Sequence, residues 1–273
     1  MSLKKGDKFI DVSSYQPADL NQLGLGSVKS IIKVSEGTGY LSQNRFAQSQ
    51  SSDVQGYYHF ARFGGSVTQA QAEANFFTSN LPSGAKWLAC DYEDSASGST
   101  QANTDAVLAF MDVCSSKGYK PIYYSYAPYT LANIDYHQIL AKYPDSIWIA
   151  AYPSYAVTKE PNWSFFPSLD GVRWYQFTST YTAGGLDANQ VLLDDDDYKV
   201  EEVLKKIGDG QMITIAGKEG GTPYAVVLGG RLIPMSSIDD IVAFQKAGAE
   251  DVWIHNDDFN RIERYLNAGL NLK

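Results

Sequence analysis

Basic residues, cysteines and long apolar runs are all scarce in this chain of 273 residues. It has 22 Lys and Arg residues against 31 Asp and Glu residues, which gives a formal net charge of -9. Such a chain does not attract nucleic acid or an anionic membrane through bulk electrostatics, so neither is expected as a partner. Two cysteines and three histidines, scattered along the chain, fit neither a disulfide framework nor a zinc site. We therefore expect two buried thiols and no metal or other cofactor.

Apolar runs are too short for a membrane helix, because none reaches about 18 residues. The opening residues, MSLKKGDKFI, also lack the apolar segment of a secretory signal. We expect a protein that is made in the cytoplasm without a signal peptide, does not insert into a membrane and acts as a monomer. Its 44% content of hydrophobic residues is enough to fill a globular core.

Short apolar or aromatic runs recur through the first part of the chain. We interpret seven of them as strands, at 9–13, 30–37, 56–62, 87–93, 121–126, 147–152 and 172–177, and expect a short eighth strand near 184–193. Several stretches between them have a helical pattern, most clearly 99–118, where an apolar stripe ends at Gly118. Strands that alternate with helices predict an α/β fold with a mostly parallel sheet. About eight such units in about 200 residues predict a closed, TIM-like (β/α)8 barrel.

A second, smaller unit follows the predicted barrel. Residues 194–210, DDDDYKVEEVLKKIGDG, have the pattern of a closing helix and linker, whose acidic run is typical of a solvated helix N-terminus. We therefore predict two domains, a barrel over 1–208 and a second domain over 209–273. The second domain has two or three apolar runs, a helix, a further strand and a final helix, which predicts a small α+β module.

The run WLACDYED, residues 87–94, ends a predicted buried strand in carboxylates. Residues two apart on a strand share a face, so Asp91 and Glu93 are predicted to point together toward the barrel axis. Like charges this close in a partly dry site oppose each other's ionisation and raise the pKa of one of them. The pair therefore predicts an acid that holds a proton near neutral pH.

Other predicted strands also end in acids. Asp11 lies in the first strand, Glu36 closes the second, and Asp187 lies in or beside the eighth. Chemistry in β/α barrels gathers at the carboxyl ends of the strands. Each acid also has a plainer explanation, in which Asp11 caps a turn, Glu36 pairs with Lys33 and Asp187 is an ordinary loop acid. The coincidence of acids from four segments at one rim favours a functional site.

The predicted rim is also aromatic, since 17 of the 19 tyrosines precede residue 200. Rings with a polar tip suit the faces of pyranose sugars. Acids and aromatics without a phosphate-binding loop indicate a glycosidase, whereas His59 is interpreted as a hydrogen-bonded strand residue. The residues expected to contact the substrate are Lys33, Glu36, Tyr58, Tyr124, Tyr152 and Gln176.

Five motifs occur together in the order and spacing of a known family. They are DVSSYQ at 11–16, IIKVSEGTGY at 31–40, GYYHFAR at 56–62, DYE at 91–93, and WYQFTS with GGLDAN between 174 and 189. With these motifs the chain resembles the glycoside hydrolase family 25 lysozymes, which are N-acetylmuramidases. The resemblance implies a modified (β/α)8 barrel with fewer than eight helices. It also implies hydrolysis of the β-1,4 bond between N-acetylmuramic acid and N-acetylglucosamine in the glycan strands of peptidoglycan.

The resemblance also implies roles for the acids. By similarity, Glu93 is the general acid/base, and Asp91, Asp11 and Asp187 are the other carboxylates of the catalytic site. Two routes stay open for the second role: Asp187 or Asp11 attacks directly, or the 2-acetamido group of the substrate attacks while Asp91 orients it. The resemblance favours the acetamido route. The alternatives are a chitinase-like or N-acetylglucosaminidase glycosidase, and a non-catalytic cell-wall-binding barrel.

The biological role rests on the same resemblance. A muramidase without a signal peptide suits a phage or prophage endolysin, which is made in the cytoplasm and acts on the cell wall after release. Lysins of this family often carry a wall-targeting module after the barrel, which implies the same role for residues 209–273. Its sugar platforms would be Trp253, Tyr224 or Tyr265. The alternative is that these rings form the core of the small domain.

Overall fold

The computed structural model describes residues 3–194, 206, 210–217, 224–228, 231–235 and 238–254. It divides the chain into two compact units, Leu3–Asp194 and Asp195–Lys273.

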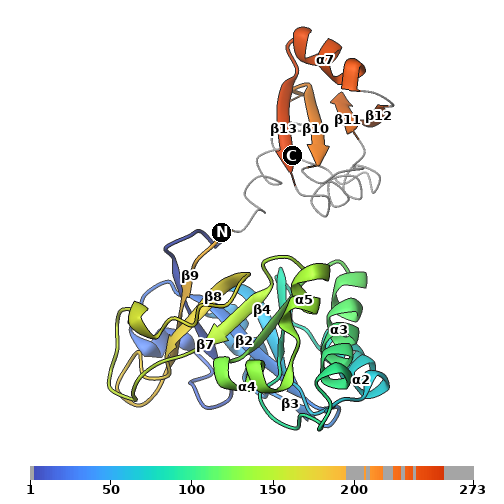
Figure 1. Cartoon of the computed structure of the whole chain (residues 1–273). Helices are drawn as coiled ribbons and strands as arrows, with labels where there is room; N and C mark the ends of the chain where they lie inside the picture. The colour runs from blue at the N-terminus through green and yellow to red at the C-terminus, as the bar shows by residue number, and fades with distance from the viewer. Residues whose placement is uncertain are drawn as a thin grey trace. The chain divides into compact units, whose positions relative to one another are not determined.

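Eight strands form a closed barrel in the first unit (Figure 1). They are β1 (Lys8–Val12), β2 (Lys29–Glu36), β4 (Asp53–Phe60), β5 (Trp87–Asp91), β6 (Lys120–Tyr126), β7 (Ile147–Ala150), β8 (Val172–Thr178) and β9 (Asp187–Val191). Neighbours from β1 to β8 pair in parallel, whereas β9 runs antiparallel to both β8 and β1 and closes the ring. The predicted TIM-like barrel is confirmed, with its last strand reversed. A short strand that was not predicted, β3 (Tyr40–Leu41), pairs with β2 outside the ring.

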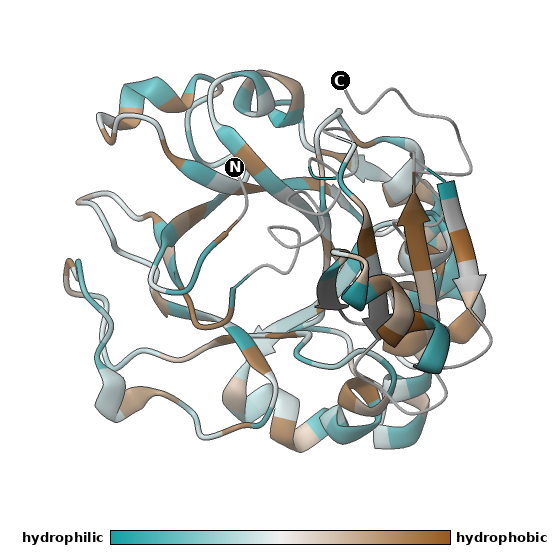
Figure 2. Ribbon diagram, turned by 90° about the horizontal axis from the view of Figure 1, so that it is seen from above, coloured by the Kyte–Doolittle hydropathy of each residue, from teal (hydrophilic) through white to brown (hydrophobic). Residues whose placement is uncertain are grey.

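Five α-helices accompany the strands within residues 3–194, which is fewer than eight, as the family resemblance implied. They are α1 (Arg45–Gln50), α2 (Val67–Ser79), α3 (Thr100–Ser116), α4 (Ala127–Asn133) and α5 (Tyr136–Lys142), with short 3-10 turns η1 (Leu20–Leu23) and η2 (Trp163–Phe165). Between β7 and β8 only η2 forms, because Pro153, Pro161 and Pro167 interrupt this segment. The helices carry both hydrophobic and hydrophilic segments, as expected for elements with one buried face (Figure 2).

The helix predicted over 99–118 is α3, and its ends follow from local chemistry. Ser99 caps its first turn by accepting a hydrogen bond from the N–H of Ala102, at 3.2 Å. Gly118 follows its last turn with a φ of 89°, a left-handed conformation that favours glycine. The predicted stripe is buried at Val107, Phe110 and other positions. The free cysteines of β5 and α3 are buried in the same outer core, as expected.

An apolar layer fills the barrel interior. Its members alternate along the strands with residues that pack under the helices, and they are Phe9, Ile31, Trp87, Ala89, Ile122, Trp148, Trp174 and Val191. The ring of Trp174 lies 5.1 Å from that of Trp87 and 5.1 Å from that of Phe9, both edge-on. A Cβ atom at Gly56 would lie 2.5 Å from the carbonyl oxygen of Trp87, so β4 carries glycine at this point.

The second unit contains a sheet in the order β12-β11-β10-β13, in which β10 and β13 are parallel and the other pairs antiparallel. Its elements are β10 (Ile213–Gly217), β11 (Tyr224–Leu228), β12 (Arg231–Met235), α7 (Ile238–Lys246) and β13 (Glu250–Ile254). These elements match the predicted α+β pattern up to residue 254. The predicted final helix, with Tyr265, and most of the predicted closing helix at 194–210 lie outside the described residues.

In the part of the chain that the structure describes, no helix combines the length and apolar content that crossing a bilayer requires.

Candidate active site

The inward positions above the apolar layer carry polar side chains at the carboxyl end of the barrel. Asp11 lies two residues beyond Phe9 on β1, Asp91 is the last residue of β5, and Asp187 is the first residue of β9. The strand predicted over 87–93 ends at Asp91, so the predicted strand was two residues too long. Strand alternation therefore does not explain the position of Glu93. Glu93 lies in the loop that follows β5.

Asp11 and Asp187 are direct partners in the antiparallel register of β1 and β9, and their carboxyl groups share a hydrogen bond. Asp11 Oδ2 also accepts hydrogen bonds from Asn189 Nδ2 at 2.7 Å and Gln176 Nε2 at 3.1 Å. Burial raises the pKa of Asp11 to about 6, against the opposing effect of these amide donors. Burial and the charge of Asp11 raise the pKa of Asp187 to about 9. The pair therefore holds a proton near neutral pH.

Asp91 is buried among charges of the same sign. Burial, followed by the charge of Glu93, raises the pKa of Asp91 well above its ordinary value, while Lys33 opposes the shift. Its Oδ1 atom is buried and accepts no hydrogen bond from the described residues. A buried polar atom without a partner costs stability, so it suits a site where a ligand supplies the donor.

Glu93 is partly exposed, unlike Asp91. Burial, then the charges of Asp11 and Asp94, raises the pKa of Glu93, and Lys33 partly offsets this. A carboxyl group with a raised pKa and access to solvent can deliver a proton and be recharged afterwards.

Two tyrosines show that the four acids gather at one place. Tyr58 on β4 and Tyr124 on β6 have pKa values raised well above normal by burial and then by the charges of the four carboxyl groups at Asp11, Asp91, Glu93 and Asp187. The hydroxyl of Tyr124 also donates to Oε1 of Gln176 at 3.0 Å. Tyr152, beyond β7, has a pKa raised by burial and then in part by Asp187 and Glu93. The site thus draws side chains from strands around the whole ring.

Lys33 and Glu36, both expected to contact the substrate, form an ion pair with 2.8 Å between Nζ and Oε2. Partial burial raises the pKa of Glu36, but the hydrogen bonds from Lys33 and Arg62 outweigh this effect and lower the pKa. The Lys33 ammonium also lies over the rings of Phe60 and Tyr40, at 4.8 and 5.6 Å from their centroids. Glu36 therefore forms the ion pair with Lys33 that the sequence offered as its non-catalytic role.

Sequence reasoning missed Asn189, although its position two residues after Asp187 puts it on the same face of β9. Its Oδ1 accepts a hydrogen bond from Trp148 Nε1 at 2.7 Å, while its amide donates to Asp11. Asn189 thus links the apolar layer to the carboxyl groups. The ionic partners Arg62 and Asp94 were also missed, because nothing local in the sequence indicates that they meet.

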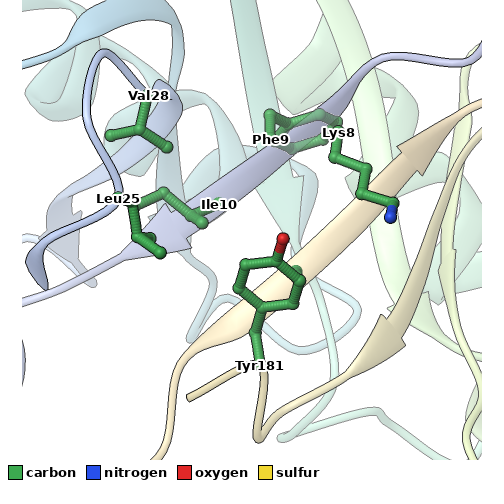
Figure 3. Close-up of a pocket in the computed structure, with 7 residues that line it drawn as sticks. Lys8, Phe9, Ile10, Leu25, Val28 and Tyr181 are labelled. Carbon is green, nitrogen blue, oxygen red and sulfur yellow. The ribbon is translucent and has the colours of Figure 1, made fainter. Parts of the chain in front are cut away.

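No group of three or more His, Cys, Asp or Glu side chains among the described residues is arranged to hold a metal ion. A hollow of about 110 Å³ lies elsewhere on the barrel, and its lining residues are Lys8, Phe9, Ile10, Leu25, Val28, Tyr181 and Ala188 (Figure 3). None of the four site carboxyl groups lines this hollow.

Comparison with known proteins agrees with the predicted family. The family model described as "Glycosyl hydrolases family 25" matches residues 10–186. The chain is 58% identical over 219 residues to a D-alanyl-L-alanine endopeptidase of Streptococcus phage B30, covering 79% of this chain and 49% of that protein. It is 49% identical over 197 residues to a lysozyme of Streptococcus phage Cp-1, covering 71% of this chain and 56% of that protein. The chain thus spans about half the length of these curated relatives.

A solved structure shares both sequence and fold with the chain. It is the modular Cpl-1 endolysin complexed with a peptidoglycan analogue, which is 43% identical and has a TM-score of 0.68, covering 81% of this chain and 62% of that one. With the barrel, the ring of acids and the family match over most of the first unit, the chain belongs to glycosyl hydrolases family 25.

Proposed function

We propose that the chain is a lysozyme that hydrolyses the β-1,4 bond between N-acetylmuramic acid and N-acetylglucosamine in peptidoglycan. The observation that carries the proposal is the partly exposed Glu93, whose pKa is raised beside the buried carboxyl groups of Asp11 and Asp91 and the partly buried one of Asp187. Glycoside hydrolysis needs a proton for the leaving oxygen and negative charge near the oxocarbenium-like carbon. The relative from phage Cp-1 is a lysozyme, and the Cpl-1 endolysin structure contains a peptidoglycan analogue, which supports the same substrate here.

Glu93 donates the proton in this proposal. Its carboxyl group protonates the glycosidic oxygen as the bond to the anomeric carbon breaks, and it then accepts a proton from the water that completes hydrolysis. Lys33 limits how far the pKa of Glu93 rises, so that the group can cycle between its two forms.

The acetamido group of the substrate is our proposed nucleophile. Its oxygen attacks the anomeric carbon as the leaving oxygen takes the proton, and water then opens the resulting ring with retention of configuration. Asp91 Oδ1 is buried and accepts no hydrogen bond from the described part of the chain, which supports a role as the acceptor for the acetamido N–H. Asp11 is less suited to attack, because two amide groups and the carboxyl group of Asp187 already occupy it.

The first experiment identifies the bond that is cut. Purified peptidoglycan is digested with the wild type and with Glu93→Gln, and the new reducing ends are reduced with borohydride and analysed by mass spectrometry. We expect muramic acid ends, and a loss of about 10² to 10⁴ in rate for the variant. N-acetylglucosamine ends would instead mean an N-acetylglucosaminidase, and full activity of Glu93→Gln would remove the assigned acid.

The second experiment tests the nucleophile. Wall fragments whose muramic acid lacks the N-acetyl group are compared with matched acetylated fragments. Turnover is expected to collapse on the former, whereas undiminished turnover would exclude participation of the acetamido group and favour direct attack by Asp187 or Asp11.

We also propose that the domain at 209–273 binds the cell wall and brings a phage-type endolysin to its substrate. Support comes from the relatives, which come from Streptococcus phages and continue beyond the part that this chain matches. A chain that ends at residue 208 is compared with the full chain in a wall-pelleting assay. Equal binding of both chains would refute a wall-binding role.

A further inference from the structure

Four side chains of alternating charge form a row beside the candidate site: Lys33, Glu36, Arg62 and Asp94. The Arg62 guanidinium donates to Glu36 Oε1 from Nη2 at 2.7 Å and from Nε at 3.0 Å. Its Nη1 donates to Asp94 Oδ2. Lys33 completes the row through its ion pair with Glu36. The row joins the end of β2 to the loops that follow β4 and β5.

The backbone of Arg62 is fixed from inside the protein. Its N–H donates to Glu73 Oε2 at 2.9 Å, and Glu73 is fully buried on α2. The same oxygen lies 2.9 Å from His59 Nε2, while His59 Nδ1 lies 2.8 Å from the hydroxyl of Ser35. Burial lowers the pKa of His59, although Glu73 opposes this, so the imidazole is a neutral structural link, as predicted for a strand histidine. A side chain anchored at such a point has little freedom to drift.

The guanidinium of Arg62 also packs against an aromatic ring. Its guanidinium carbon lies 4.5 Å from the centroid of the Phe60 ring. A planar fork with several N–H donors can bridge two carboxylates at once, which a single ammonium group cannot do in the same geometry.

The loop that carries Glu93 is tied on both sides of this residue. Before it, the hydroxyl of Tyr92 donates to the carbonyl of Gly64 at 3.0 Å. After it, Asp94 accepts the hydrogen bond from Arg62. Both hydrogen bonds join the Glu93 loop to the loop after β4, so the position of Glu93 depends on that loop.

We propose that Arg62 is a positioning residue for the reaction: it holds the loop of Glu93 against the end of β2 and neutralises the carboxylates of Glu36 and Asp94 beside it. The inference rests on the proposed role of Glu93 as the acid. A surface ion pair by itself contributes little to stability, so the value of this bridge lies in geometry and local charge.

Several groups set the charge around Glu93, and the test must be read against all of them. The charged neighbours are Asp11, Lys33, Asp91, Asp94 and Asp187, and the tyrosines are Tyr58, Tyr124, Tyr129 and Tyr152. Removal of Arg62 leaves Asp94 and Glu36 less compensated, which makes protonated Glu93 more favourable. Removal of the charge of Asp94 acts in the opposite direction.

The experiment measures kcat, KM and the pH profile of peptidoglycan hydrolysis for Arg62→Gln, Arg62→Lys and Asp94→Asn in the full chain. Arg62→Gln is expected to lower kcat about 10- to 100-fold with KM nearly unchanged, because the acid is misplaced. The basic limb of the pH profile of Arg62→Gln is expected to move up by about half a pH unit, which is the effect of one screened charge several Å away.

Asp94→Asn removes the charge from the same contact and weakens it, but is expected to move the basic limb of the pH profile down. Arg62→Lys keeps the charge and is expected to restore the wild-type limb while kcat recovers only in part. Opposite shifts from two variants that weaken one contact cannot come from general destabilisation. Lys142→Gln, which breaks a surface ion pair with Asp112 on the outer helices, is the matched control and is expected to keep wild-type kinetics.

Wild-type kcat and pH profile in Arg62→Gln would overturn the proposal, and so would shifts of the same sign in Arg62→Gln and Asp94→Asn. If Arg62→Gln does not fold, the contrast between Arg62→Lys and Asp94→Asn decides the outcome in the same way. Failure of the proposed function is seen separately, as full activity of Glu93→Gln or as the wrong reducing end.

Discussion

Two layers of the same barrel interior have opposite chemistry, although on β1 and β8 they lie only two residues apart. Phe9, Trp87 and Trp174 belong to the apolar layer, in which rings pack edge to face. Asp11 and Gln176 follow two residues later in the polar layer, where carboxyl groups are buried beside one another.

The difference shows where stability and activity reside in this protein. Burial of apolar side chains contributes roughly 1.5 to 3 kcal/mol each, so the lower layer stabilises the barrel. Burial of carboxyl groups beside like charges opposes folding, and their raised pKa values record that cost. The upper layer is therefore retained for chemistry, and substitutions in the two layers should affect different measurements.

The largest expected effect comes from Trp148→Ala in the apolar layer. It leaves a cavity and removes the donor to Asn189, so we expect a loss of about 3 to 5 kcal/mol in the free energy of unfolding. Denaturant unfolding measures the loss. Trp148→Phe keeps a ring and should cost clearly less, so equal losses would mean that the cavity does not dominate.

Asp91→Asn in the polar layer should do the reverse. We expect turnover of peptidoglycan to fall by about 10² to 10³, as for the loss of a group that stabilises charge in the transition state. The melting temperature should not fall, because the variant removes a buried group whose ionisation the site opposes. Unchanged turnover, or a melting temperature well below that of the wild type, would contradict the division between the layers.

Asp187→Asn should flatten the dependence of stability on pH. The folded chain holds the protons of Asp187 and Asp11 more tightly than the unfolded chain, since their pKa values are raised to about 9 and about 6. This stabilisation is present at low pH and is lost as the pH rises toward about 9. We expect the decline in stability between about pH 5 and about pH 8 to shrink by several kcal/mol in the variant, at roughly 1.4 kcal/mol per pH unit.

Unfolding by denaturant at several pH values checks the flattening. Asp112→Asn, at a surface acid paired with Lys142, is the control and should keep the wild-type slope. A steeper decline in Asp187→Asn would show that the shared proton does not belong to this pair.

Tyr124→Phe should have the smallest effect. It removes one hydrogen bond to Gln176, whose amide group donates to Asp11, and so loosens the orientation of that carboxyl group. The expected loss in kcat/KM is roughly two- to tenfold, which corresponds to a single hydrogen bond of about 0.5 to 1.5 kcal/mol. A loss beyond a hundredfold in steady-state kinetics would assign the Tyr124 hydroxyl a direct part in the chemistry.

Much of the barrel was predictable from local patterns. The apolar runs gave the eight strands, and an apolar stripe that stops at Gly118 marked α3 and its end. The strand at 87–93 was predicted too long, because period-two alternation cannot tell a pleated strand from the extended loop after it. The short hairpin strand β3 has too few residues for any periodic signal.

The candidate site was predictable in part. Acids at strand ends indicated where chemistry gathers, and the structure brings Asp11, Asp91, Glu93 and Asp187 to one end of the barrel. Strand alternation could also have identified Asn189, two residues after Asp187. The contact between Arg62 and Asp94 could not be predicted in this way, because loops after different strands meet only when the sheet closes.

The sequence by itself determined which residues alternate between the barrel interior and the helices, since this depends on strand pleat and the hydrophobic effect. Only the tertiary structure decided that β9 runs antiparallel and sets Asp187 against Asp11, that Asp91 Oδ1 is buried with no donor among the described residues, and that Arg62 joins two loops. The physical reason is range: pleat and capping act over a few residues, whereas register, burial and the pKa values that follow from them depend on strands distant in the chain closing into one ring.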